Sequence, residues 1–157
     1  VQIAAMKDLG ANVTPLPVSE LFSALQQRLV DAQENPLTTI YTQKYYEEQK
    51  YCTLTRHSYT TTIFFMNRNF FNSLSDNQKL AVQKANEAAR DQSRAVLETV
   101  DEKYAKLLEE MGMEIYTPTD EELKAFQEAV QPTWETVKAT VGDDNWALLV
   151  DTVNNAE

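Results

Sequence analysis

The sequence predicts an α/β protein whose second half is mostly helical. In the first half, segments with helical periodicity alternate with short segments rich in β-branched and aromatic residues, an order that favours βαβ units. Between residues 75 and 111, one apolar stripe repeats at spacings of three and four, which predicts a single helix about 50 Å long. The 157 residues are enough for one domain with a buried core.

The first elements follow from local capping signals. Residues 1–9 have the pattern of the end of an amphipathic helix, and Gly10 is placed to stop it. Weak alternation around two prolines predicts an edge strand over residues 12–17, and Ser19 is a suitable cap for a helix over residues 20–31. A second helix is predicted over residues 37–49, and strands are predicted over residues 50–57, 59–67 and 113–116.

The second half carries stronger helix signals. Ser75 with Gln78, and Thr119 with Glu122, form two capping boxes at the starts of helices. Gly112 is expected to end the long helix. Pro132 is expected to kink or restart the following helix, and Asp143 or Asp144 is expected to cap a last short helix.

Composition excludes several classes of function. The chain carries 14 Lys and Arg against 24 Asp and Glu, a net charge of −10, so nucleic acid and anionic membrane surfaces are poor partners. Cys52 is the only cysteine and His57 the only histidine, so we expect no intramolecular disulfide, no metal site and no cofactor. Three glycines cannot build a phosphate-binding loop, and no stretch approaches the roughly 18 apolar residues of a membrane span.

Four tyrosines between residues 41 and 51 have two interpretations. They could stack on a ligand, or they could pack at the edge of the core, and we favour the core. They are Tyr41, Tyr45, Tyr46 and Tyr51. The chain also begins inside a helical pattern without an N-cap, so we expect it to be a fragment of a longer protein.

The segment A-L-Q-Q-R-L-V-D-A-Q-E-N-P, residues 24–36, carries the most information about function. It resembles the signature A-L-Q-x-G-x-V-D-[GA]-x-E-N-P of the solute-binding proteins of TRAP (tripartite ATP-independent periplasmic) transporters. Arg28 stands where the signature has Gly, and we expect it at an exposed helix position. Three further blocks resemble the family in the same order, over residues 10–20, 41–51 and 54–59.

The resemblance implies a non-enzymatic function. A two-lobe periplasmic protein would close on a small carboxylate, most simply a C4-dicarboxylate, and deliver it to membrane permease subunits. The chain would be the C-terminal half of such a protein, with a long spine helix and C-terminal helices. Its parts would be a share of the second lobe over residues 1–60, a strand crossing to the first lobe over 61–74, the spine helix over 75–111, and a strand and helices over 112–157.

The resemblance also implies site residues. Asn35 matches the Asn whose amide contacts the ligand carboxylate, although an Asn before Pro is by itself more often a turn residue. Val18 matches a pocket-lining position, and Tyr59 could offer a hydroxyl to the pocket. Glu34 and His57 match a pair that interacts behind the site and helps to hold it closed.

The family's principal ligand-binding residue is an Arg for which this chain has no match. The positions of Arg28, Arg56 and Arg68 do not fit its motif. As a lone half, the chain is expected to bind dicarboxylate weakly or not at all. It is also expected to associate with a second copy through apolar residues that lose their cover. The residues most at risk are Ile63, Phe64 and Phe65.

Two alternatives come from other classes of protein. A small hydrolase could use His57 as base and Glu34 as its orienting group, but the sequence offers no credible nucleophile. A helical interaction module could be built on the long helix, but the mixed charge of its polar face names no partner.

Overall fold

The computed structural model describes residues 1–60 and 62–155, and the predicted α/β class is confirmed: helices dominate and one small sheet is present. The first elements are α1 (Gln2–Asp8), α2 (Val18–Gln26), α3 (Leu37–Thr42), the 3₁₀ turn η1 (Tyr45–Glu47) and β1 (Tyr51–Thr53). They are followed by α4 (Arg68–Ser73), α5 (Asp76–Glu110), β2 (Glu114–Tyr116), α6 (Asp120–Ala129), α7 (Gln131–Val141) and α8 (Asp143–Asn154).

The described chain divides into two compact units, which we treat separately. The first unit comprises Val1–Leu21, Thr53–Thr55 and the described part of Tyr116–Glu157. The second unit comprises Phe22–Cys52 and the described part of Arg56–Ile115.

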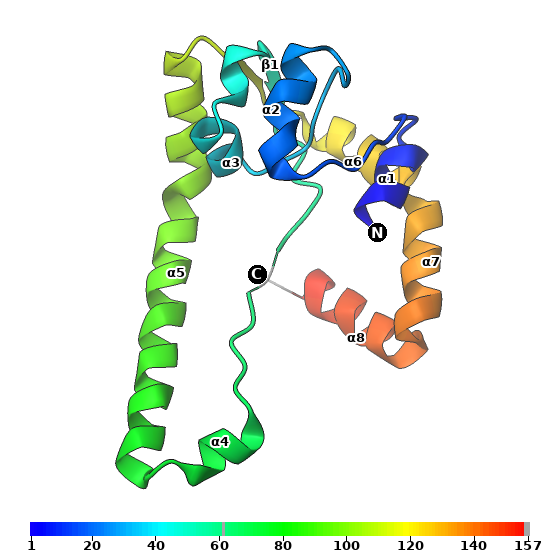
Figure 1. Ribbon diagram of the computed structural model, residues 1–157. Helices are drawn as coiled ribbons and strands as arrows, with labels where there is room; N and C mark the ends of the chain where they lie inside the picture. Colours follow the sequence, from blue (N-terminus) through cyan, green and yellow to red (C-terminus); the bar gives the residue numbers. More distant parts are fainter. Residues whose placement is uncertain (61, 156–157) are drawn as a thin grey trace. The chain divides into compact units, whose positions relative to one another are not determined.

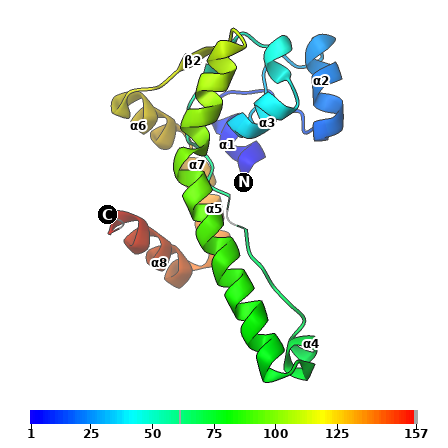
Figure 2. The same ribbon diagram turned by 90° about the vertical axis from the view of Figure 1, so that its left-hand side faces the viewer.

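The core of the second unit forms where α3 packs against the C-terminal end of α5 (Figures 1 and 2). Tyr45 and Leu108 are fully buried there, and the Tyr41 ring meets the Tyr104 ring edge-on with centroids 5.5 Å apart. For Tyr41 and Tyr45, the interpretation as core residues is therefore confirmed. Tyr51, by contrast, is exposed.

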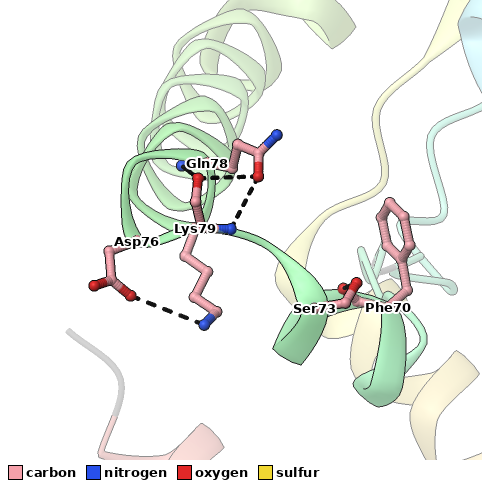
Figure 3. Close-up of polar contacts among 6 residues, drawn as sticks. Phe70, Ser73, Asp76, Gln78 and Lys79 are labelled. Carbon is pink, nitrogen blue, oxygen red and sulfur yellow. Dashed lines mark hydrogen bonds and ion pairs between the residues drawn. The ribbon is translucent and has the colours of Figure 1, made fainter.

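The long helix begins and ends where predicted. The Ser75 hydroxyl accepts from the Gln78 backbone N–H at 3.4 Å, and the Ser75 backbone N–H donates to the Gln78 side chain at 2.9 Å (Figure 3). At the other end, Gly112 has a φ of 91°, and the Met113 N–H donates to the Leu108 carbonyl at 3.0 Å, which closes a Schellman motif. The predicted helix over residues 75–111 thus matches α5 to within a residue at each end.

The strand predicted over residues 59–67 is not formed. Residues 59–60 and 62–67 lie outside any strand, Thr61 lies outside the described residues, and the chain then enters α4, a helix that the sequence did not predict. Asn67 starts α4, because its side-chain oxygen accepts from the backbone N–H groups of Asn69 and Phe70 at 3.0 and 3.1 Å. A strand needs a paired neighbour as well as β propensity, and the described residues supply no such neighbour here.

Other predicted elements are shorter in the structure. Residues 12–17 form no strand, and the helix predicted over residues 20–31 ends at Gln26. The helix predicted over residues 37–49 is broken at Lys44, where φ is 58°. The strand predicted over 50–57 is reduced to β1.

β1 and β2 form a two-stranded parallel sheet. Within the second unit, the Glu114 N–H donates to the Lys50 carbonyl at 2.7 Å. Within the first unit, the Leu54 N–H donates to the Tyr116 carbonyl at 2.9 Å. Both partners advance along the chain together, which is the ladder of parallel strands.

The first unit is held together by polar and aromatic contacts among its helices. The Asp8 carboxylate, at the end of α1, accepts from the Thr133 hydroxyl at 2.6 Å and from the Thr133 backbone N–H at 3.1 Å, and Thr133 is buried. The rings of Trp134 on α7 and Trp146 on α8 lie 6.4 Å apart. Pro132 lies in the first turn of α7, so it restarts the helix as predicted.

The Thr119–Glu122 capping box is present at the start of α6, as predicted. Within the part of the chain that the structure describes, no helix combines the length and the apolar composition needed to cross a membrane.

Candidate functional site

The candidate site is built on the segment between α2 and α3. At the end of α2, the Arg28 N–H donates to the Leu25 carbonyl at 3.0 Å, and the Leu29 N–H donates to the Ala24 carbonyl at 2.8 Å. These two bonds make a Schellman motif with Arg28 in the left-handed conformation at φ 56°. The expected exposure of Arg28 is confirmed, but its expected helix position is wrong, because α2 ends at Gln26. Arg28 lies just after the end of α2, where the backbone is left-handed. Gly adopts this conformation without strain, which explains why the signature has Gly there.

After this turn, residues 31–36 run without helix or strand, and burial alternates from residue 32 to residue 37. Gln33 and Asn35 are partly buried and Leu37 is buried, whereas Glu34 and Pro36 are exposed. In an extended chain, neighbouring side chains point to opposite sides and every second one shares a side. The Asn35 and Glu34 side chains therefore lie on opposite sides of the same short segment.

Glu34 contacts His57 on its side of the segment. The His57 Nε2 atom lies 3.2 Å from the Glu34 Oε2 atom, and the side chains are 29% and 39% exposed, respectively. The pairing expected from the sequence is therefore present between residues 23 positions apart in the chain. It joins the segment before α3 to the chain that follows β1.

Asn35 contacts a residue that the sequence analysis missed. The Asn35 Nδ2 group donates to the Gln33 Oε1 atom at 2.6 Å, and this hydrogen bond is partly buried. Gln33 occupies a position that the signature leaves undefined, so the resemblance drew no attention to it. The signal that could have found it is the spacing of two, which puts both amides on one side of an extended segment.

The other two expected site residues, Val18 and Tyr59, belong to different units. Val18 is the first residue of α2 and belongs to the first unit, whereas Asn35, Glu34, His57 and Tyr59 belong to the second. Tyr59 is 85% exposed, so its hydroxyl is not enclosed by the described residues.

A separate hollow of about 500 Å³ lies within the first unit. Its walls include Leu9, Tyr116, Glu122 and Phe126. The Tyr116 hydroxyl donates to the Glu122 carboxylate at 2.8 Å. Hydrogen bonds from the Thr119 backbone N–H and from the Tyr116 and Thr119 hydroxyls lower the pKa of Glu122, and the bond to Glu122 raises the pKa of Tyr116. No expected site residue lines this hollow.

Comparison with known proteins identifies the family. Residues 1–140 match the model of the bacterial extracellular solute-binding protein family 7, DctP. The chain belongs to this family. The 2,3-diketo-L-gulonate-binding periplasmic protein YiaO of Escherichia coli is 36% identical to it over 131 residues, which cover 83% of this chain and 39% of that protein.

Solved structures of DctP-type proteins share the fold. A TRAP periplasmic solute-binding protein from Ochrobactrum anthropi is 36% identical, with a TM-score of 0.87 over 98% of this chain and 49% of that chain. The sugar acid binding protein DctPAm from Advenella mimigardefordensis, in complex with galactonate, is 35% identical, with a TM-score of 0.84 over 99% of this chain and 50% of that chain. The chain thus spans half or less of the length of these DctP relatives.

Membership of the DctP family decides several expectations. The chain has the fold of half a TRAP periplasmic binding protein, as the resemblance implied. The family is one of solute-binding proteins and not of enzymes, which removes the hydrolase alternative. The expected localisation is confirmed through the relatives, which are periplasmic binding proteins.

Proposed function

We propose that this chain is part of a TRAP transporter solute-binding protein that captures a small organic carboxylate in the periplasm and delivers it to membrane permease subunits. The observation that carries the proposal is the arrangement of residues 33–35. Asn35 offers a partly buried amide on one side of the segment, while Glu34 on the other side contacts His57 at 3.2 Å. An amide donor suits a carboxylate ligand, because a hydrogen bond to a charged acceptor is stronger than one between neutral groups.

In this proposal each residue has a distinct role. Asn35 donates to the ligand carboxylate, and Val18 and Tyr59 line the pocket. The Glu34–His57 contact ties the segment that carries Asn35 to the chain after β1, so it supports the closed arrangement. Residues 1–60 contribute to one lobe, residues 61–74 connect it to the other, and α5 is the spine within residues 75–111.

We propose a C4-dicarboxylate as the ligand, on the resemblance of His57-Ser58-Tyr59 to the pattern of dicarboxylate-type members. A sugar acid is the second candidate. It is favoured by the relatives at 36% and 35% identity, one named for 2,3-diketo-L-gulonate and the other solved with galactonate. Both ligands carry the carboxylate that Asn35 would bind.

The test is a binding assay on the complete gene product that contains this chain. Succinate, galactonate and 2,3-diketo-L-gulonate are titrated by calorimetry, and galactose serves as a control without a carboxylate. We expect one of the acids to bind and galactose not to bind. Binding of galactose as tight as that of the best acid would contradict a carboxylate site, and binding of none of the acids would overturn the proposed ligand class.

A further inference from the structure

The strongest unexplained contact in the candidate site is the hydrogen bond between two side-chain amides. The Asn35 Nδ2 group donates to Gln33 Oε1 at 2.6 Å, the shortest distance for an N–H donor at this segment. The two residues share one side of the extended segment and are both partly buried, next to the buried Leu37. Their contact is therefore part of the packed side of the segment and not a solvent-facing encounter.

This contact links the orientation of the Asn35 amide to that of the Gln33 amide. An asparagine amide has two N–H donors on one end and one oxygen acceptor on the other. If the Asn35 amide alone turned by half a rotation about its Cβ–Cγ bond, its oxygen would face the Gln33 oxygen and two acceptors would meet. The hydrogen bond would return only if the Gln33 amide turned as well and presented its NH₂ group to the Asn35 oxygen. A net hydrogen bond favours the observed orientation over a turn of the Asn35 amide alone by roughly two- to twelvefold.

The orientation matters for the ligand because only the nitrogen end can donate to a carboxylate. Gln33 occupies one N–H of Asn35 and leaves the second for another acceptor. We propose that Gln33 is a positioning residue, which fixes the orientation of the Asn35 amide and thereby sets how strongly Asn35 binds a carboxylate. The inference rests on the proposed function, in which Asn35 binds the ligand.

The first test needs no ligand. In the ligand-free protein, the side-chain NH₂ signals of Asn35 are assigned by their disappearance in Asn35→Ala. Gln33→Met keeps the length of the side chain but removes the acceptor, so we expect these signals to move, while Gln33→Glu keeps an acceptor and holds the hydrogen bond. Gln43→Met is the matched control, because Gln43 is an exposed glutamine at the end of α3 and should leave the signals in place.

The second test is a double-mutant cycle on binding of the acid found by the titration. Gln33→Met should weaken binding about two- to twelvefold in the otherwise unchanged protein and have almost no effect in the Asn35→Ala background. Gln43→Met should have no effect in either background. If Gln33 merely stabilised the fold, Gln33→Met would weaken binding by the same factor in both backgrounds.

The outcomes separate the two proposals. Unmoved Asn35 signals in Gln33→Met, or equal losses of affinity with and without Asn35, would overturn the role of Gln33. If no acid binds while the signals move as expected, the Gln33–Asn35 contact stands and the proposed ligand class is overturned. Movement of the Asn35 signals in Gln33→Met, together with a loss of affinity that occurs only when Asn35 is present, would establish Gln33 as a positioning residue.

Discussion

Arg28 holds a backbone conformation that glycine adopts without strain. Its φ is 56°, and two other basic residues also have a positive φ, Lys44 at 58° and Arg56 at 48°. A left-handed backbone costs a residue with a Cβ atom roughly 1–2 kcal/mol. The residues at these positions carry no local signal of their own, and only the Gly of the family signature marks position 28, which is why the helix ends at Gln26 and Thr42 escaped prediction.

We expect Arg28→Gly to raise the free energy of unfolding by up to about 1 kcal/mol, since glycine relieves the strain but has more freedom to lose on folding. Urea unfolding at neutral pH measures the change. Arg28→Ala is the control, because it removes the charge and keeps the Cβ atom. A gain in Arg28→Ala as large as in Arg28→Gly would show that the side chain, and not the backbone, was the cause.

Asn35→Ala should weaken carboxylate binding by roughly 1.5–3 kcal/mol, or about 10- to 150-fold, the range for a hydrogen bond to a charged group. The fold should survive, because the Asn35 side chain is only partly buried. Calorimetry on the complete gene product measures the affinity, with Asn86→Ala as a control at an exposed asparagine on α5. Unchanged affinity in Asn35→Ala would remove Asn35 from the site.

At the scale of the element, the features that could be predicted from the sequence are those that depend on residues close together in the chain. The capping boxes of α5 and α6 and the glycines after α1 and α5 act within a few residues, and all were found in place. The strand expected over 59–67 depends on a partner that no local pattern can supply. The Gln33–Asn35 contact was missed for a different reason, because it lies at an undefined position of the signature.

The capping box of α6 predicts a pH dependence of stability. Hydrogen bonds, first the one from the Thr119 backbone N–H, lower the folded-state pKa of Glu122. The stability that the Glu122 carboxylate adds to the fold is therefore complete above the unfolded-state pKa near 4.3. It is lost as the pH falls through the folded-state pKa. Glu122→Gln should be less stable than the unchanged chain at pH 7, and the difference should shrink as the pH falls below about 4. Urea midpoints across this range measure it.

The control for that experiment is Glu121→Gln, which alters the neighbouring carboxylate of the same first turn. It removes the same charge but leaves the bonds among Tyr116, Thr119 and Glu122 in place. The same pH dependence in both variants would trace the effect to general charge and not to the capping box.

At the scale of the whole molecule, the apolar segment after Tyr59 stands out. Ile63, Phe64 and Phe65 are 75%, 71% and 93% exposed. Exposed apolar clusters of this kind favour association. We expect the 157-residue chain to sediment above its monomer mass of 17.9 kDa, and Phe64→Ser with Phe65→Ser to shift it toward the monomer.

Leu29→Ser tests whether any exposed apolar residue would act in the same way, because Leu29 is 72% exposed and lies elsewhere in the second unit. It should leave the sedimentation unchanged. An unmodified chain that stays monomeric at the highest concentration tested would rule out association through this segment.

The exposure of α5 has a consequence for how the chain opens. Residues 83–97 of this helix are exposed on every side, whereas Tyr104 and Leu108 pack near its C-terminal end. A helical stretch without tertiary packing is marginally stable in water. Amide hydrogens over residues 83–97 should therefore exchange with deuterium well before those over 104–110, through local opening that leaves the α3–α5 core intact. Uniform protection along α5 would show that the helix opens only as one unit.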